Sequence, residues 1–349
     1  MKIYSSLFAD MIAPENLFAA WDAFKKGKGE KPDVARFEFR LEENIFALHR
    51  ELKAKTYRHA PYHAFYIRDP KVRHIHKASV RDRVLHHAVF SVLNPIFEPT
   101  FIANSFSCRI GKGNHLGVDT LEAMLRKVSR NGCAPCFVLK CDIRKYFESI
   151  DHDILTDILR RRVRDPDALW LIGEIVRSFP ADVAPDDARR GLPIGNLTSQ
   201  LFANVYLNEL DQFVKHRLIV KHYARYTDDF VIIADNHDYL TDLIPRITDF
   251  LHDTLALGLH PNKVSIRKYH AGIDFLGYTA RPHYRSVRTK AKRRMLRKLA
   301  RRIREYKAGT ISEQTLNQSL QSYLGVLSHA NAHRIAERIR NEVWCALRN

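Results

Sequence analysis

The hydrophobic pattern of the chain predicts helices first and a hairpin next. The pattern up to about Lys55 reads as helical, with a flexible Gly- and Lys-rich stretch at 25–31. Two short strand-like runs follow at 64–67 and 72–75. The turn-forming Arg68-Asp69-Pro70 lies between these runs, which predicts that they pair as a hairpin.

The rest of the pattern predicts a mixed body followed by a helical tail. A helix is expected over about 80–93, and helices alternate with short apolar strands between residues 121 and 276, which indicates an α+β fold. The segment 281–307 reads as one amphipathic helix, and a second helix is expected from about Ser312. With a boundary near residue 283, we expect two domains, 1–283 and 284–349.

The net charge of the chain predicts a polyanionic partner. The 349 residues include 57 Lys and Arg against 39 Asp and Glu, a net charge of +18, and 13 of these cations lie in 281–307 beside a single acid, Glu305. Such a density favours a surface that follows nucleic-acid phosphates, with an ordinary solvated helix face as the alternative. No apolar run approaches the roughly 18 residues of a membrane span, and five cysteines suit a reducing compartment, so we expect a cytoplasmic protein without a membrane partner.

Carboxylates stand at the ends of two apolar strands. Asp142 ends the run Phe137–Cys141, and Asp228 and Asp229 lie within the run 223–233, which reads as a hairpin with Thr227 and Asp228 at its tip. Adjacent acids between apolar strands are costly if buried without a cation, and hard oxygen ligands select Mg²⁺ or Mn²⁺. Carboxylates on neighbouring strands hold two ions about 4 Å apart in phosphoryl-transfer enzymes. The alternative is that Asp228 and Asp229 form a solvated turn.

Three other patterns have ordinary explanations. The glycines of 111–117 do not have the spacing of a dinucleotide-binding loop, and Cys133 and Cys136 lack the second ligand pair of a zinc site. His86 and His87 are adjacent on a predicted helix and cannot both face one metal ion.

Several motifs, in their order along the chain, resemble those of reverse transcriptases. Tyr226-Thr227-Asp228-Asp229 resembles the aromatic-x-Asp-Asp box, and the segment from Asp142 to Phe147 resembles the box that carries the other metal aspartate. Further similar segments extend the resemblance over roughly residues 60 to 335: Arg81–Leu85, Ser105–His115, Gly258–Lys263, Phe275–Tyr278 and Ser322–Asn331.

One motif narrows the resemblance to a subfamily. Most reverse transcriptases have Gln-Gly-x-x-x-Ser-Pro where this chain has Ile194-Gly195, followed by Ser199-Gln200. This form resembles the enzymes of diversity-generating retroelements, which copy a template RNA into cDNA with errors concentrated at adenines. The alternatives are a bacterial defence or intron-derived reverse transcriptase and an inactive polymerase-like RNA-binding scaffold.

The resemblance implies a right-hand polymerase, with fingers and palm (antiparallel sheet plus helices) over 1–283 and a helical basic thumb over 284–349. In this family a primer 3′-hydroxyl attacks the α-phosphate of a dNTP with the help of two Mg²⁺ ions, and Mn²⁺ is expected to substitute. Template RNA, primer or cDNA, dNTPs and a small accessory variability protein oligomer are the implied partners, in a bacterial or phage-encoded system. The catalytic and metal residues implied are Asp142, Ile143, Asp228 and Asp229.

The resemblance also implies residues that bind the substrates. A nucleotide-binding role follows for Lys71 and Arg73 on the hairpin, where an exposed surface role is the rival for Lys71, and for Phe147, Ile194 and Lys263. We expect Phe147 to select deoxyribonucleotides by blocking a ribose 2′-hydroxyl, and the alternative is a core phenylalanine. Contacts with the primer–template backbone are expected from Arg293, Arg294, Arg297 and Arg301.

Overall fold

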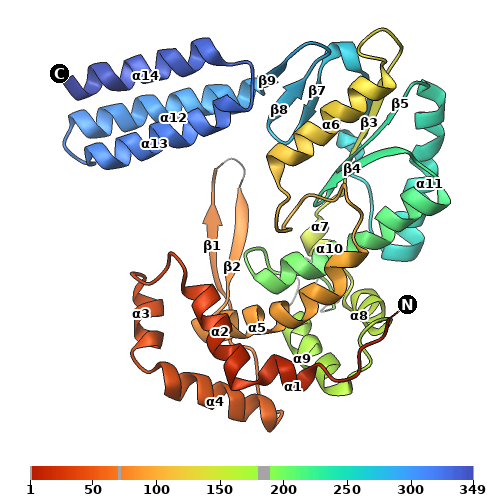
Figure 1. Cartoon of the computed structure of the whole chain (residues 1–349). Coiled ribbons are helices and arrows are strands. Elements are labelled where there is room, and N and C mark those ends of the chain that lie inside the picture. The colour runs from red at the N-terminus through yellow and green to blue at the C-terminus, as the bar shows by residue number, and fades with distance from the viewer. Residues whose placement is uncertain (1, 70–71, 180–188, 349) are drawn as a thin grey trace.

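The computed structural model describes residues 2–69, 72–179 and 189–348. Figure 1 shows a lower layer of N-terminal helices, a strand-containing body on the right and a bundle of C-terminal helices at the upper left, with the hairpin β1–β2 rising between them. Helices and antiparallel sheets are both present, as the sequence predicts. Within the described residues, no helix combines the length and the apolar character that crossing a bilayer requires.

The first helical layer is built around large apolar side chains. Trp21, Phe24, Ile45 and Leu48 are all at most 2% exposed and lie in one core with residues of α5. Pro14 and Pro32 stand in the first turns of their helices, where their missing N–H groups cost nothing. The helices of this layer are α1 (Phe8–Ile12), α2 (Pro14–Lys25), α3 (Pro32–Glu38), α4 (Leu41–Lys53) and α5 (Val80–Phe97).

The hairpin between α4 and α5 forms where the sequence predicts it. Strand β1 (His63–Ile67) pairs antiparallel with β2 (Arg73–Lys77), and the register runs from His63 opposite Lys77 to Ile67 opposite Arg73. Every residue of β1 is exposed. Pro70 and Lys71, in the turn, lie outside the described residues, so the expected role of Lys71 stays a prediction.

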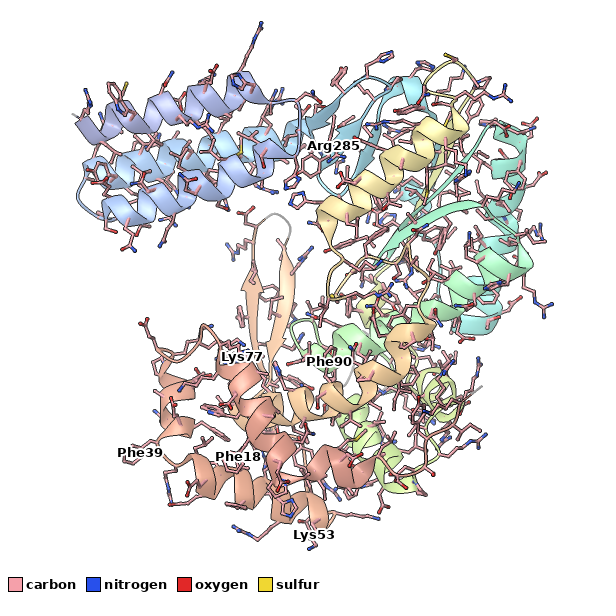
Figure 2. The ribbon with its side chains drawn as sticks, in the orientation of Figure 1. Phe18, Phe39, Lys53, Lys77, Phe90 and Arg285 are labelled. Atoms are coloured by element: carbon pink, nitrogen blue, oxygen red, sulfur yellow. The ribbon has the colours of Figure 1, made fainter. Side chains whose placement is uncertain are left out.

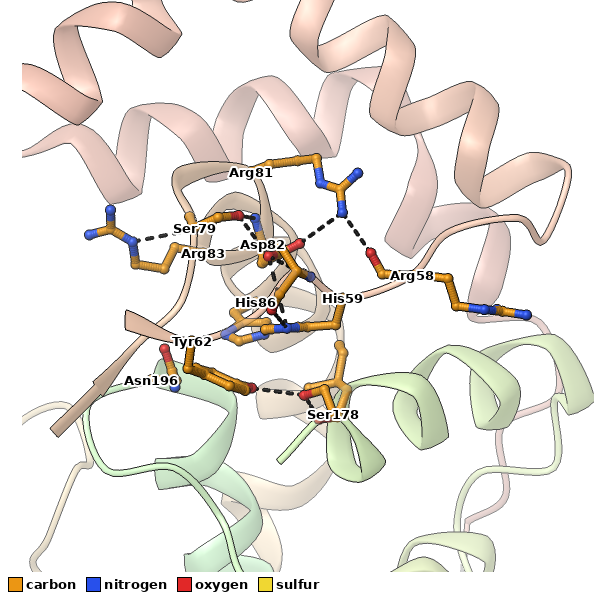
Figure 3. A network of polar contacts seen from close by, with 12 residues as sticks. Arg58, His59, Tyr62, Ser79, Arg81, Asp82, Arg83, His86, Ser178 and Asn196 are labelled. Atoms are coloured by element: carbon orange, nitrogen blue, oxygen red, sulfur yellow. Dashed lines mark hydrogen bonds and ion pairs between the residues drawn. The ribbon is translucent and has the colours of Figure 1, made fainter. Parts of the chain in front are cut away.

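A buried carboxylate fixes the base of this hairpin to α5 (Figure 3). Asp82 is fully buried and accepts hydrogen bonds from Tyr57 Oη at 2.8 Å, from the backbone N–H of Ala60 at 3.1 Å and from Ser79 Oγ at 2.6 Å. Ser79 also caps α5 by accepting from the N–H of Asp82. Asp82, within the segment 81–85 that resembles a reverse transcriptase motif, therefore holds the segment that leads into β1.

The central sheet has the strand order β4-β5-β3-β6, and all its pairs are antiparallel. Successive side chains along each strand point to opposite faces of the sheet. In β3, Leu139 and Cys141 pack with the core that includes α11, whereas Val138 packs with the core that includes α6. The elements of this part are β3 (Phe137–Asp142), β4 (His222–Tyr226), β5 (Asp229–Ala234), β6 (Ser265–Lys268), α6 (Asn114–Val128) and α11 (His237–Leu255).

Further helices connect the sheet to the lower layer. The most buried is α10 (Leu197–Gln212), whose Phe202, Tyr206 and Leu207 have no exposed surface. The others are α7 (Tyr146–Ser149), α8 (His152–Arg160), α9 (Pro166–Arg177), the π-helical turn Phe213–Arg217 and the 3₁₀ turns Glu98–Thr100, Pro261–Lys263 and Tyr269–Ala271.

The C-terminal part corrects one prediction. The expected helix over 281–307 begins only at Thr289, because Arg285–Val287 forms a strand, β9, that pairs with β8. This pairing lies across the predicted boundary near residue 283, so the division into two domains stays a prediction. The remaining elements are β7 (Ile273–Phe275), β8 (Tyr278–Ala280), α12 (Thr289–Lys307), α13 (Glu313–Ser328) and α14 (His333–Arg348).

Arg285 joins the helical bundle to α6 (Figure 2). Its guanidinium pairs with Glu122 at 2.7 Å and Asp119 at 2.5 Å, and it also donates to the carbonyl of His329 at 3.1 Å. The side chain of Asn331 accepts from the N–H of Arg285 at 2.9 Å. One strand residue thus ties the end of α13 to the body.

Candidate active site

The three candidate carboxylates meet at one end of the central sheet. Asp142, the last residue of β3, is the direct partner of Asp229, the first residue of β5. Asp228 is in the two-residue turn between β4 and β5, as the sequence predicts, and its carbonyl accepts from the N–H of Ile143 at 3.1 Å. The structure therefore brings the adjacent residues Asp142 and Ile143 together with Asp228 and Asp229, which lie more than 80 positions further along the chain.

The turn that carries Asp228 is held by a buried ion pair. Arg225 and Asp211 have no exposed surface, and the guanidinium donates to both carboxylate oxygens of Asp211 at 2.7 and 2.6 Å. Arg225 also donates to the carbonyl of Thr227 at 3.0 Å, and the Thr227 hydroxyl donates to Ser107 Oγ at 2.6 Å. Thr227 has φ +54°, which is uncommon for a β-branched residue, so these contacts fix a strained turn.

Two lysines neutralise part of the carboxylate charge. Lys263, in the 3₁₀ turn Pro261–Lys263, donates to Asp142 Oδ1 at 2.7 Å. Lys140 lies 3.0 Å from Asp229 Oδ2. Asp228 has no such partner among the described residues, and burial, followed by the charges of Asp142 and Asp229, raises its pKa to about 6. Burial likewise raises the pKa of Asp229, against the lowering effect of Lys140.

These residues fit a divalent cation that is completed by substrate. Asp229 Oδ1 is buried and has no hydrogen-bond partner among the described residues, so it is free to bind a cation. No three His, Cys, Asp or Glu side chains within residues 2–69, 72–179 and 189–348 form a ready metal cage. Mg²⁺ does not need one, because it is commonly held by one or two carboxylates together with water and substrate phosphates.

Backbone hydrogen bonds connect segments that carry Arg73, Phe147 and Ile194, three of the residues predicted to bind the nucleotide. The carbonyl of Phe147, in α7, accepts from the N–H of Leu192 at 2.7 Å, and two residues later the carbonyl of Ile194 accepts from His76 on β2 at 3.3 Å. Phe147 and Ile194 are both half-buried. Arg73 is exposed on β2, and its charge lowers the pKa of Tyr226 against the stronger effect of burial, which raises it. Backbone bonds therefore connect the hairpin, the Ile194 loop and the Phe147 helix.

The arginines predicted to contact nucleic acid are all exposed on α12. Two of them have protein partners: Arg294 lies 3.6 Å from Asp69 in the β1–β2 turn, and Arg301 lies 3.4 Å from Glu305. Lys298 also pairs with Asp69. The basic face of α12 therefore contacts the hairpin. The expected contacts of Arg293, Arg294, Arg297 and Arg301 with nucleic acid stay a prediction.

Sequence reasoning missed three residues of this site, Lys140, Arg225 and Asp211. Lys140 shares a strand face with Asp142, and Arg225 precedes the aromatic-x-Asp-Asp motif by one position, so a cation beside each acidic segment was the available signal. Nothing in the sequence indicates that Asp211, on α10, is the partner of Arg225.

Comparisons of the sequence with known proteins find several relatives of this chain. Protein YkfC of Escherichia coli is 25% identical over 274 residues, covering 68% of this chain and 71% of its own length. The group II intron-encoded protein LtrA of Lactococcus lactis is 27% identical over 221 residues, covering 61% of this chain and 36% of its own length. An uncharacterized 91 kDa protein in the cob intron of Schizosaccharomyces pombe is 28% identical over 145 residues, covering 40% of this chain and 16% of that protein.

The sequence profile of the reverse transcriptase (RNA-dependent DNA polymerase) family matches residues 67–280. This segment is more than half of the chain, and it contains strand β2, the central sheet and all three carboxylates. The chain therefore belongs to the reverse transcriptase (RNA-dependent DNA polymerase) family.

Proposed function

We propose that this chain is an RNA-directed DNA polymerase that extends a primer on a template RNA with dNTPs. The observation that carries the proposal is the meeting of Asp142, Asp228 and Asp229 at the end of the β3–β5 pair, within the segment that matches the family. In this reading residues 1–283 are fingers and palm, and residues 284–349 are the thumb.

The residues of the chain have separate tasks in this reaction. Asp142, Asp228 and Asp229, with the backbone of Ile143, would hold two Mg²⁺ ions, which when bound activate the 3′-hydroxyl and stabilise the pyrophosphate leaving group. Arg73 would contact the triphosphate, because a guanidinium suits phosphate oxygens. Phe147 would lie against the sugar, and Lys263, which donates to Asp142 in this structure, would contact the nucleotide.

The direct test is extension of a DNA primer annealed to a defined RNA template, with dNTPs and either Mg²⁺ or Mn²⁺. The proposal predicts full-length cDNA that depends on the divalent cation and on the RNA. Binding of the RNA without any extension would instead support the inactive scaffold.

We further propose that the cDNA serves a diversity-generating retroelement, with errors concentrated at template adenines and a small accessory variability protein as partner. This proposal rests on Ile194-Gly195 with Ser199-Gln200, and the adenine preference and the partner come from the resemblance alone. A template repeat and a matching variable repeat beside the gene would support it, and a cDNA error spectrum without an adenine excess would contradict it.

A second candidate is an intron-derived reverse transcriptase, which the similarity to the group II intron-encoded protein LtrA favours. The chain spans about a third of the length of that relative. Under this candidate, cDNA synthesis would show ordinary fidelity at adenines, so the same error spectrum separates the two.

A further inference from the structure

Lys140 makes three contacts, and together they connect a candidate catalytic carboxylate to a neighbouring sheet. Its Nζ lies 3.0 Å from Asp229 Oδ2, donates to the carbonyl of Asp274 at 2.9 Å, and lies over the ring of Phe275, 5.7 Å from the centroid. Asp229 begins β5, whereas Asp274 and Phe275 belong to β7. Lys140 itself is on β3, so one side chain joins three strands of two sheets.

The contacts continue from β7 to the base of the C-terminal bundle. The carboxylate of Asp274 accepts from the hydroxyl of Thr279 on β8 at 2.6 Å and lies 3.1 Å from Nε of Arg288. Arg288 is the residue that immediately precedes α12. The position of Asp229 is therefore linked by polar contacts to the β7–β8 hairpin and to the start of α12.

The charge of Lys140 also matters for the carboxylate cluster. Asp142 and Asp229 are direct neighbours across the sheet, and like charges in this position repel. Lys263 engages Asp142, and Lys140 engages only Oδ2 of Asp229, which leaves the buried Oδ1 available. Lys140 is 28% exposed in its side chain, so its charge is only partly screened by solvent.

We propose that Lys140 is a positioning residue for nucleotidyl transfer: it anchors Asp229 to β7 and supplies a fixed counter-charge beside the ion site. This inference rests on the proposed polymerase function. Removing Lys140 should have two opposite effects. The site becomes more negative and binds a divalent cation more tightly, while Asp229 loses its anchor and the reaction slows.

The test compares Lys140→Met, Lys140→Arg and the control Lys268→Met. Lys268 is an exposed lysine of β6 in the same sheet, opposite Phe137 on β3, so its loss changes the net charge equally without touching Asp229. Mn²⁺ is titrated into each protein without nucleotide, and free Mn²⁺ is counted by electron paramagnetic resonance. Primer extension is measured at saturating Mg²⁺, and thermal melting checks that each variant is folded. Lys140→Gln replaces Lys140→Met if the latter melts below the assay temperature.

We expect Lys140→Met to bind Mn²⁺ about tenfold more tightly, because one opposite charge shifts the ionisation of a neighbouring carboxylate by a similar factor. Its kcat should fall at least about tenfold, because a displacement of about 1 Å at a reacting centre costs about 100-fold, while the KM for dNTP stays within threefold. Lys140→Arg should keep the Mn²⁺ affinity of the wild type. If Lys140→Met equals Lys268→Met in either Mn²⁺ affinity or kcat, the inference is overturned. If the wild type extends no primer, the proposed function fails, and the Mn²⁺ titration still decides the role of Lys140.

Discussion

Asp142 and Asp229 face each other directly across the antiparallel pair β3–β5. Like charges in this position destabilise a sheet, and here each carboxylate has a lysine partner, Lys263 for Asp142 and Lys140 for Asp229. Asp228 adds a third, half-buried carboxylate whose pKa is raised to about 6 by burial and by the charges of Asp142 and Asp229. The arrangement stores unfavourable charge at one end of the sheet, which binding of divalent cations would relieve.

Phe147→Val should admit ribonucleotides. In the proposed polymerase, the half-buried ring of Phe147 in α7 occupies the space that a ribose 2′-hydroxyl would need. We expect the ratio of rNTP to dNTP incorporation to rise at least about tenfold, since a steric clash commonly costs more than 1.4 kcal/mol. Single-nucleotide incorporation kinetics measure this ratio. An unchanged ratio in a folded variant would return Phe147 to an ordinary core role.

Ile194→Gln should lower misincorporation if the diversity-generating assignment is correct. The side chain of Ile194 offers no hydrogen-bond donor or acceptor, whereas Gln offers both. One hydrogen bond contributes about 0.5–1.5 kcal/mol, so discrimination should improve several-fold, up to about tenfold. Sequencing of the cDNA from a defined RNA measures errors opposite each base. Equal error spectra would indicate that Ile194 only packs in the loop beside β2.

Replacing Arg293, Arg294, Arg297 and Arg301 by Gln should weaken the salt dependence of primer–template binding. Each duplex phosphate that a cation neutralises contributes a slope of about −0.9 in a plot of log affinity against log salt concentration. We expect the slope to become less steep by about two to four, and processivity to decrease. Fluorescence anisotropy at several salt concentrations measures the slope. If it does not change, the exposed face of α12 is a solvated surface or contacts a protein instead.

The imidazoles of His59 and His86 predict a loss of stability in mild acid (Figure 3). His59 Nδ1 donates to the carbonyl of Ala60 at 2.6 Å, so its Nε2 accepts from His86 Nε2 at 3.3 Å, and His86 Nδ1 is left buried without a partner among the described residues. Burial lowers the pKa of both residues in the folded protein, and Asp82 opposes this effect at His59.

The sign of this effect follows from the lowered pKa values. Below pH 6.5 the unfolded chain binds protons at these histidines and the folded protein does not, so stability is complete above pH 6.5 and decreases below it. Each pH unit should cost up to about 1.4 kcal/mol for each such group. Chemical unfolding between pH 7.5 and 5.5 should show a smaller loss for His86→Met than for the wild type. His252→Gln, at an exposed position of α11, is the control, and equal losses in all three proteins would contradict the prediction.

Local patterns were sufficient for much of the fold. The hairpin β1–β2 and the turn at Thr227 and Asp228 follow from apolar runs with turn residues between them, because a hairpin is specified by neighbours in sequence. The strand Arg285–Val287 was missed because three residues are too few to show alternation. Arg285 also looked like part of the basic helix, whereas its partners Asp119 and Glu122 are more than 160 residues away.

The same limit applies to the site. The carboxylates could be identified because they belong to contiguous motifs, and the pairing of Asp142 with Asp229 required only that β3 and β5 be neighbours. The roles of Lys140 and Arg225 depend on contacts with Asp274 and Asp211, on elements that the sequence does not place beside them. From the sequence alone, charged residues at such positions are predicted to lie on the surface, because the packing of the sheets is not known.

The measurement that tests this account most directly is primer extension on an RNA template by the wild type and by Asp228→Asn, each with Mg²⁺. Asparagine keeps the shape of the side chain and removes its charge, so we expect extension to fall by at least about 1,000-fold, a loss of about 4 kcal/mol in transition-state stabilisation. The melting temperature in the presence of a chelator should not decrease. The substitution removes one of three negative charges that repel one another in the folded protein. Near-normal extension by Asp228→Asn would contradict the assignment of this carboxylate cluster as the catalytic centre.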